Sequence, residues 1–105
     1  MHLYERHAHH YKTKSTRGLL KIQNLQSERI LLVPSEQFVH DIQAIRFQLD
    51  LGTFDHPVLQ KEYETLGLEL FVIEPYKETE DQCMDLAKLC KHETSLLANK
   101  HKKLY

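Results

Sequence analysis

The sequence predicts an α+β domain in which a small three-stranded antiparallel sheet is flanked by helices, in the order β-β-α-α-β-α. Two short runs rich in strand-forming residues lie close together, separated by a short linker. Two helical patterns, an apolar run of strand length and a long amphipathic pattern follow. The chain has 105 residues, 41% of them hydrophobic, which suits one ordinary domain with a core that needs no metal or disulfide.

The first two strands are expected at residues 18–24 and 29–33, because both runs are rich in Leu, Ile and Val. The short connection between them predicts a hairpin, and therefore antiparallel pairing. Pro34 has no N–H to donate to a ladder, so we expect the second strand to end at Val33. Ser35 can then cap the helix that follows.

The first helix is predicted from apolar residues that recur every three or four positions, at Phe38, Ile42, Ile45 and Leu49. Gly52 is the expected left-handed end of this helix. Polar residues occupy the other side of the pattern, so one face of the helix should be buried and the other hydrated.

The second helix is predicted to begin at Asp55 as its cap, with Pro57 in the first turn, and to end at Gly67. Phe54 is placed to pack against this helix from outside its first turn. Its inward face is expected to comprise Leu59, Tyr63 and Leu66.

Residues 68–73 form an apolar run that predicts the third strand, ended by Pro75. A strand that is apolar at almost every position is covered on both faces, which indicates helices on both sides of the sheet. Thr79 and Gln82 then match a capping box at the start of the last helix. The buried face of that helix is expected to comprise Cys83, Leu86, Ala87, Cys90 and Leu97.

Charge is distributed unevenly along the chain. The formal net charge is -1, but residues 1–18 have a net charge of +3 and residues 19–99 one of -7, while the end adds Lys100, Lys102 and Lys103. An acidic body argues against tight, sequence-independent nucleic-acid binding unless the two basic ends converge on one face. No apolar stretch is long enough to span a membrane or to act as a secretory signal, so we expect a cytoplasmic protein.

Residues 1–17 have no helical or strand period and are interpreted as a flexible, basic, histidine-rich arm that precedes a single domain at 18–105. His7, His9 and His10 could bind a transition metal, although no ordered spacing or Cys partner supports such a site. A solvated tail and a basic arm that helps to hold nucleic acid are the alternatives.

Several short pieces of the chain occur in the order and at the spacing of a known family. They are residues 18–24, 31–33, Ser35, 49–52, 59–63, 66–67 and 70–74. Together they resemble the GIY-YIG nuclease domain, which occurs in homing endonucleases and in an incision subunit of bacterial excision repair. The resemblance covers residues 18–105 and implies the β-β-α-α-β-α fold of that family.

The resemblance also shows where the chain departs from the family. It implies that Leu20 and Leu31 stand where the family has its two signature tyrosines, and that Asp41 stands at or near the place of the helix arginine. A leucine cannot accept a proton, and a carboxylate repels a phosphate. Only the metal-binding glutamate of the family has a counterpart, Glu93, which would hold Mg²⁺ if cleavage remained.

Other residues could in principle replace the missing catalytic groups. His40 and Arg46 lie on the first predicted helix, and Tyr63 and Tyr76 lie elsewhere. The structural interpretation of Tyr63 is a core-edge residue with its hydroxyl in water. The basic residues proposed to contact nucleic acid are Arg17, Lys21, Arg46, Lys100, Lys102 and Lys103.

Three functional hypotheses follow. The first is a catalytically inactive GIY-YIG-like domain that binds nucleic acid or a protein partner, with an apolar surface where Leu20 and Leu31 replace the tyrosines. The second is a divalent-metal-dependent endonuclease with a rearranged site, and the third is a small α+β regulatory or scaffold protein. The sequence contains no glycine-rich phosphate loop, C-x-x-C, H-E-x-x-H or G-x-S-x-G motif that would favour another class of enzyme.

Overall fold

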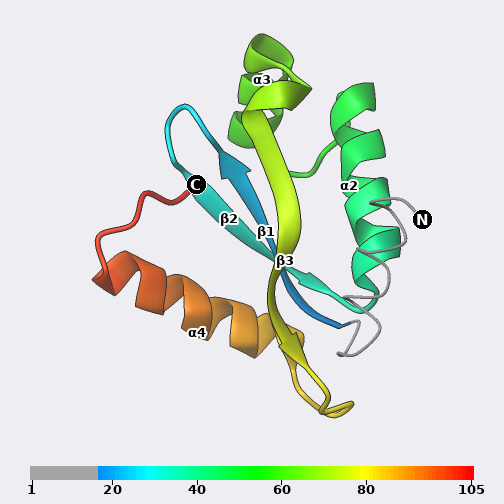
Figure 1. The fold of residues 1–105 in the computed structure, drawn as a ribbon, viewed down its shortest axis with the longest axis vertical. Helices are drawn as coiled ribbons and strands as arrows, with labels where there is room; N and C mark the ends of the chain where they lie inside the picture. The colour runs from blue at the N-terminus through cyan, green and yellow to red at the C-terminus, as the bar shows by residue number, and fades with distance from the viewer. Residues whose placement is uncertain (1–16) are drawn as a thin grey trace, which may run out of the picture.

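The computed structural model describes residues 17–105, and the predicted arm therefore lies, except for Arg17, outside the described residues. The order of elements is the predicted one, β-β-α-α-β-α (Figure 1). The elements are β1 (Arg17–Asn24), β2 (Ile30–Ser35), α2 (Phe38–Leu51), α3 (Pro57–Leu66), the short 3-10 turn η1 (Leu68–Leu70), β3 (Phe71–Thr79) and α4 (Leu86–Asn99).

The three strands form one antiparallel sheet in the order β2-β1-β3, so the first strand of the chain lies in the centre. Helices α2 and α3 cover one face of this sheet and α4 covers the other (Figure 1). The predicted arrangement of helices on both sides is confirmed. The strand that is buried on both faces is β1, however, and not β3 as its apolar sequence suggested.

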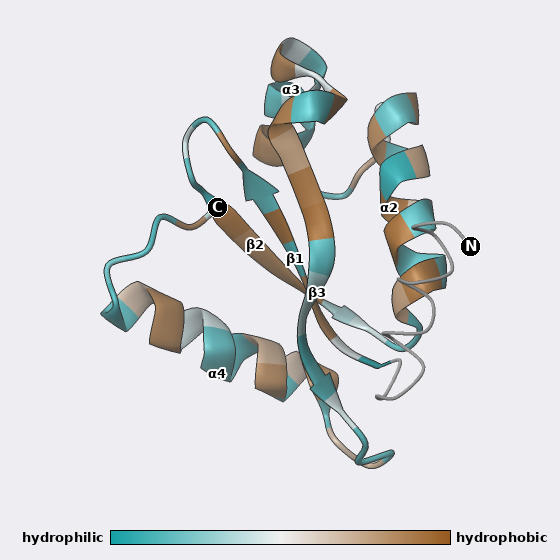
Figure 2. Ribbon diagram, in the orientation of Figure 1, coloured by the Kyte–Doolittle hydropathy of each residue, from teal (hydrophilic) through white to brown (hydrophobic). Residues whose placement is uncertain are grey.

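Two cores result from this layering, and the apolar strands between them are visible in Figure 2. Side chains alternate along β1, so Leu20 and Ile22 point to one face and Leu19 to the other. The large core, against α2 and α3, contains the buried residues Leu20, Ile22, Phe38, Ile45, Leu49, Leu59, Tyr63, Phe71 and Ile73. The small core, against α4, contains Leu19, Ile30, Leu32 and Leu97.

Gly18 is required where β1 and β3 make their closest approach. A Cβ at this position would lie 2.0 Å from the carbonyl oxygen of Lys77 and 2.8 Å from the Cα of Glu78. No side chain can occupy that space without displacing backbone. The glycine therefore allows the two strands to pair at the start of the sheet.

Both predicted strand ends at proline are wrong. Strand β2 continues through Pro34 to Ser35, and β3 continues through Pro75 to Thr79. Both strands are sheet edges, where proline is tolerated because one side of the strand needs no partner. The register between β1 and β3 also shifts between Leu19 and Leu20, which leaves Tyr76 without a partner in β1 next to Pro75. The apolar residues 68–70 form η1 instead of the first part of β3.

Helix α2 begins two residues later than a Ser35 cap would place it. Its N-cap is Gln37, which makes no side-chain capping bond. Ser35 is a buried strand residue, and its hydroxyl donates instead to Asp41 Oδ2 at 2.6 Å. The end of this helix at Gly52, with φ of 79°, is confirmed.

The other two predicted caps are also wrong. Helix α3 is capped by His56, whose ring nitrogen accepts a hydrogen bond from the N–H of Leu59, and not by Asp55. Helix α4 is capped by Asp85, because the hydroxyl of Thr79 accepts from the N–H of Asp81 and serves the preceding turn. For α4 a second good capping residue, Asp85, lies a few positions after Thr79, whereas for α3 the ring nitrogen of His56 takes the place of the preferred Asp55.

Two residues assigned to the buried face of α4 are exposed. Cys83 lies before the helix begins, and Ala87 faces outward. The buried positions of the helix are Leu86, Glu93 and Leu97, and Cys90 is half-buried. No helix within residues 17–105 is long and apolar enough to cross a membrane.

The C-terminal residues connect the two faces of the sheet. The N–H of Ile30 donates to the carbonyl of Lys103, and the N–H of Tyr105 donates to the carbonyl of Ile30. Residue 104 thereby makes a short parallel bridge to β2. Leu104 packs against the small core and Tyr105 against the large one. The outer edge of β2 is consequently paired at its first residue, Ile30.

Candidate functional site

Leu20, at the first position that the resemblance assigns to a tyrosine, is a core residue. It is 0% exposed and packs in the large core. Leu31, at the second position, is half-buried and packs against the same core from β2. The prediction of an apolar surface at these leucines is therefore wrong for Leu20, because helices α2 and α3 cover it.

Asp41 lies in the first turn of α2, beside the end of β2. It accepts hydrogen bonds from the hydroxyl of Ser35 at 2.6 Å and from the N–H of Gln37 at 3.4 Å. Partial burial raises the pKa of Asp41, but these two bonds and the neighbouring His40 outweigh it and lower the pKa below its ordinary value. The carboxylate therefore stays ionised, and it stabilises the start of the helix.

Glu93 is buried on α4 and forms an ion pair with β3. Its side chain is 8% exposed, and its Oε2 lies 2.8 Å from Nζ of Lys77, whose side chain is 49% exposed. Lys77 pairs with Leu19 in the sheet, and Leu19 belongs to the small core. Glu93 therefore lies on the opposite face of the sheet from Leu20.

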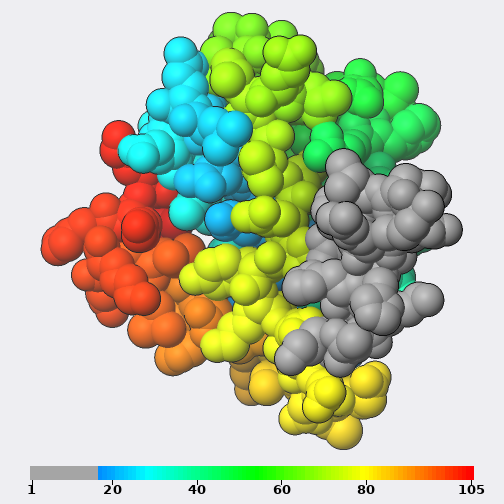
Figure 3. Space-filling view, viewed as in Figure 1, coloured from blue at the N-terminus to red at the C-terminus, as the bar shows by residue number. Residues whose placement is uncertain are grey.

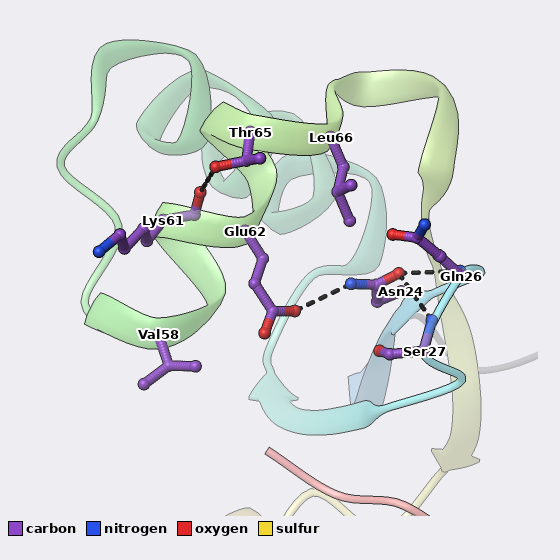
Figure 4. A pocket seen from close by; sticks show the side chains of 8 residues that line it. All are labelled: Asn24, Gln26, Ser27, Val58, Lys61, Glu62, Thr65 and Leu66. Atoms are coloured by element: carbon purple, nitrogen blue, oxygen red, sulfur yellow. Dashed lines mark hydrogen bonds between the residues drawn. The ribbon is translucent and has the colours of Figure 1, made fainter.

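A pocket of about 440 Å³ lies between the β1–β2 turn and α3 (Figure 4). At one side Glu62 points toward Asn24, whose side-chain amide donates to Glu62 Oε1 at 2.9 Å. The hydroxyl of Tyr105 donates to the same oxygen at 2.6 Å, and Arg29 bonds Glu62 Oε2 at 3.3 Å. These polar groups bond one another, so the cluster fastens the C-terminus to α3 and the hairpin turn.

The environment of this cluster shifts two pKa values in opposite directions. The hydrogen bond from Tyr105, followed by that from Asn24 and the charge of Arg29, lowers the pKa of Glu62 against the effect of burial. Burial, and then the bond to Glu62, raises the pKa of Tyr105 to about 12. Sequence reasoning missed the cluster, because Tyr105 reaches Glu62 only through the bridge between the C-terminus and β2.

No protein-family model and no curated protein matches the sequence. The structure, however, matches the catalytic domain of the homing endonuclease I-TevI with a TM-score of 0.71 at 15% identity. The match covers 83% of this chain and 94% of that one. A mutant of the catalytic domain of the intron endonuclease I-TevI matches with a TM-score of 0.70, also at 15% identity, over 83% of this chain and 89% of that one. The fold is GIY-YIG-like.

On this GIY-YIG-like fold the sequence-predicted site residues do not come together. Leu20, Leu31 and Asp41 lie toward α2, whereas Glu93 lies under α4 with Lys77. Within residues 17–105 no group of three or more His, Cys, Asp or Glu side chains is placed to hold a metal ion. Glu93 therefore has a lysine, rather than further carboxylates, as its nearest charged partner in the described chain.

The residues considered as replacements for the missing catalytic groups are also distributed over several elements. The hydroxyl of Tyr63 donates to Asp50 Oδ1 at 2.5 Å instead of facing water, and burial raises the pKa of Tyr63. His40 and Tyr76 are exposed on different elements. Arg46 is half-buried on α2, near Tyr63. A raised pKa leaves a smaller fraction of the tyrosine ionised at neutral pH, so Tyr63 is poorly suited to accept a proton.

Apart from Arg46, the basic candidates for nucleic-acid binding fall into two groups. Arg17 is buried at the start of β1, where its guanidinium binds Glu36 at 2.8 Å and the carbonyl oxygens of Asp81 and Met84. Lys21 pairs with Glu74 at 3.1 Å on the small-core face. These two cations stabilise the fold through their partners.

The second group comprises Lys100, Lys102 and Lys103, which are exposed in the turn after α4. With His101 they line a hollow of about 270 Å³ that Gln23, Glu28 and Ile30 complete. Lys88 and Lys91 are exposed on α4 itself, before this turn, and sequence reasoning did not single them out. Their three-residue spacing could have been recognised as one side of a helix.

Proposed function

We propose that this domain binds nucleic acid without cutting it. The fold resembles that of an endonuclease catalytic domain, and the residues at the catalytic positions that the resemblance implies cannot activate water or bind a phosphate. The observation that carries the proposal is the ion pair between Lys77 and Glu93, at 2.8 Å. An ammonium group neutralises the one carboxylate that could have bound a divalent metal.

The basic residues support the binding part of this proposal. The lysines of α4 and of the turn after it are exposed, and they make no side-chain ion pair within residues 17–105. Cations without an intramolecular partner are available to phosphates. The acidic residues lie mainly on the other elements of the fold, so the overall negative charge does not oppose binding on this side.

The test combines binding and cleavage in one experiment. Fluorescence anisotropy of labelled single-stranded DNA, duplex DNA and RNA is measured at low and moderate salt, with and without Mg²⁺, and the recovered strands are separated on a gel. We expect salt-sensitive binding and intact strands under every condition. Mg²⁺-dependent fragments that disappear in Glu93→Gln would contradict the proposal and support an endonuclease with a rearranged site.

A protein partner is the second candidate, and one feature of α2 favours it. Val39, Phe47 and Leu51 lie on one side of the helix and are 46%, 64% and 60% exposed. Exposed apolar side chains in a row are typical of helix-mediated association. If a second copy of the chain docks there, light scattering will detect a dimer that Phe47→Ser abolishes. A monomer at every concentration would exclude self-association through α2.

A further inference from the structure

The exposed side of α4 carries a continuous polar and basic stripe. Lys88, Lys91, His92, Ser95 and Asn99 are linked by spacings of three or four residues (88–91, 88–92, 91–95, 92–95 and 95–99), so they lie along one side of the helix. All five are exposed. The opposite side of the helix holds Leu86, Glu93 and Leu97 against the sheet. The stripe therefore faces away from the core along nearly the whole helix.

Three further lysines follow in the turn after α4, around the hollow that Glu28 also lines. Lys100, Lys102 and Lys103 are exposed there, and the N–H of Ile30 holds the carbonyl of Lys103 at 2.9 Å. The backbone of Lys100, His101 and Lys102 is fixed further by hydrogen bonds to carbonyls of the last helical turn. The lysines thus project from a fixed backbone, which reduces the entropy that a ligand must remove on binding.

Helix α4 and the turn after it are basic, whereas the rest of the described chain is acidic. Residues 86–103 contain five lysines and one carboxylate, Glu93, which Lys77 neutralises. Residues 17–85 contain six lysines and arginines against thirteen acidic residues. Figure 3 shows α4 and the C-terminal residues, in orange and red, on one flank, with α2 and α3, in green, away from it.

The length of the stripe suits a regular polyanion. Lys88 and Asn99 are eleven positions apart, which corresponds to about 16 Å along the helix axis. One strand of duplex DNA carries about five phosphates over that axial distance. An acidic peptide has no such fixed charge spacing, and a single strand would lose conformational freedom on a straight, rigid surface.

We propose that the exposed side of α4 and the turn after it, from Lys88 to Lys103, bind the phosphate backbone of duplex DNA. This inference rests on the proposed nucleic-acid binding and adds the surface and the form of the ligand. Lys88 and Lys91 contact phosphates along the helix, and Lys100, Lys102 and Lys103 contact them at its end. Ser95 and Asn99 supply neutral hydrogen-bond donors between the two groups of cations.

The test compares two variants that remove the same charge from different surfaces. Lys88→Gln/Lys91→Gln changes the stripe. The control, Arg46→Gln/Lys61→Gln, changes α2 and α3; the sequence suggested Arg46 as a contact, but it lies half-buried on α2 and this proposal places it outside the binding surface. The binding of a short labelled DNA duplex is measured by anisotropy over a range of salt concentrations. Each lost phosphate contact lowers the slope of log K against log salt by about 0.9, so we expect the stripe variant to lower it by about 2. The control should keep the wild-type slope.

Each outcome has a separate meaning. If the wild-type protein binds no nucleic acid, both the proposed function and this inference fail. If it binds and the control variant loses as much slope as the stripe variant, or more, the inference alone fails. Tighter binding of the single strand than of the duplex would also overturn it. Both variants alter only exposed or half-buried side chains. Circular dichroism should be used to check that they are folded before binding is compared.

Discussion

The two faces of the sheet differ in what they bury. The large core, on the side of α2 and α3, is almost entirely apolar and includes Leu20 and Leu31, at the positions that the resemblance assigns to tyrosines. The other face buries a smaller apolar cluster beside the Lys77–Glu93 and Lys21–Glu74 ion pairs. The comparison indicates that the α2–α3 face provides most of the packing that stabilises the fold. The face beneath α4 holds the ion pairs Lys77–Glu93 and Lys21–Glu74.

The largest expected effect is on the α2–α3 face. Leu20→Ala leaves a cavity in the large core and should lower the free energy of unfolding by about 3 to 4 kcal/mol. Leu97→Ala in the small core should cost about 2 kcal/mol, because α4 can shift toward the sheet and fill part of the space. Urea denaturation of both variants measures the two losses in the free energy of unfolding and shows which is larger. A larger loss for Leu97→Ala would contradict the assignment of the main stabilising core.

Restoring a tyrosine should damage the large core instead of creating activity. Leu20→Tyr inserts a larger, polar side chain at a position with 0% exposure and should cost about 2 to 3 kcal/mol. Leu31→Tyr can direct its hydroxyl to water from a half-buried position, and should cost less than about 1 kcal/mol. Thermal unfolding and the gel assay measure stability and cleavage. A stable, cleaving Leu20→Tyr protein would refute the structural role given to Leu20.

On the α4 face the ion pair at Glu93 is the sensitive point. Lys77→Met leaves the buried carboxylate without its cation and should cost about 1 to 2 kcal/mol, a value reduced by the exposure of Lys77 to water. Lys21→Met is the matched control, because its partner Glu74 is half-exposed and can be hydrated, and it should cost less than about 1 kcal/mol. Equal losses, measured by denaturation, would show that burial of Glu93 has no energetic consequence.

The smallest expected effect concerns Tyr105, at the C-terminal segment that connects the two faces. This effect depends on pH. Because the folded-state pKa of Glu62 is lowered, Glu62 contributes stability above its unfolded pKa of about 4.3, and this stability is lost as the pH falls through the folded value. Tyr105→Phe removes the hydrogen bond that contributes most to the shift and should cost about 1 kcal/mol at neutral pH. Unfolding temperatures between about pH 3 and pH 7 should show a smaller acid-induced decrease in this variant. An unchanged pH profile would exclude Glu62 as the source of the acid-induced decrease in unfolding temperature.

The sequence predicted the elements of the fold better than their ends or the position of the site. Helices and strands follow from periodicity that packing reinforces, so α2 ends at Gly52 as predicted. The ends depend on tertiary context: Pro34 and Pro75 are tolerated only because β2 and β3 are sheet edges. The site residues could not be grouped in advance, because the face on which each side chain lies depends on strand register.

Glu93 illustrates this limit most clearly. The resemblance suggested a metal ligand, whereas the structure buries Glu93 beside Lys77, sixteen residues away. Lys77 was hidden in a polar segment that was predicted to follow the third strand. Only the continuation of β3 past Pro75 brings the ammonium group to the carboxylate.

The most direct test of the division between the two faces is an NMR titration of the isotope-labelled protein with a short DNA duplex. We expect amide resonances to shift in α4 and in the turn after it, from Lys88 to Lys103, and those of α2 and α3 to remain unchanged. The C-terminal bridge to β2 should persist through the titration, since it positions the turn. Shifts concentrated on α2 and the end of β2, with α4 unaffected, would contradict the central claim.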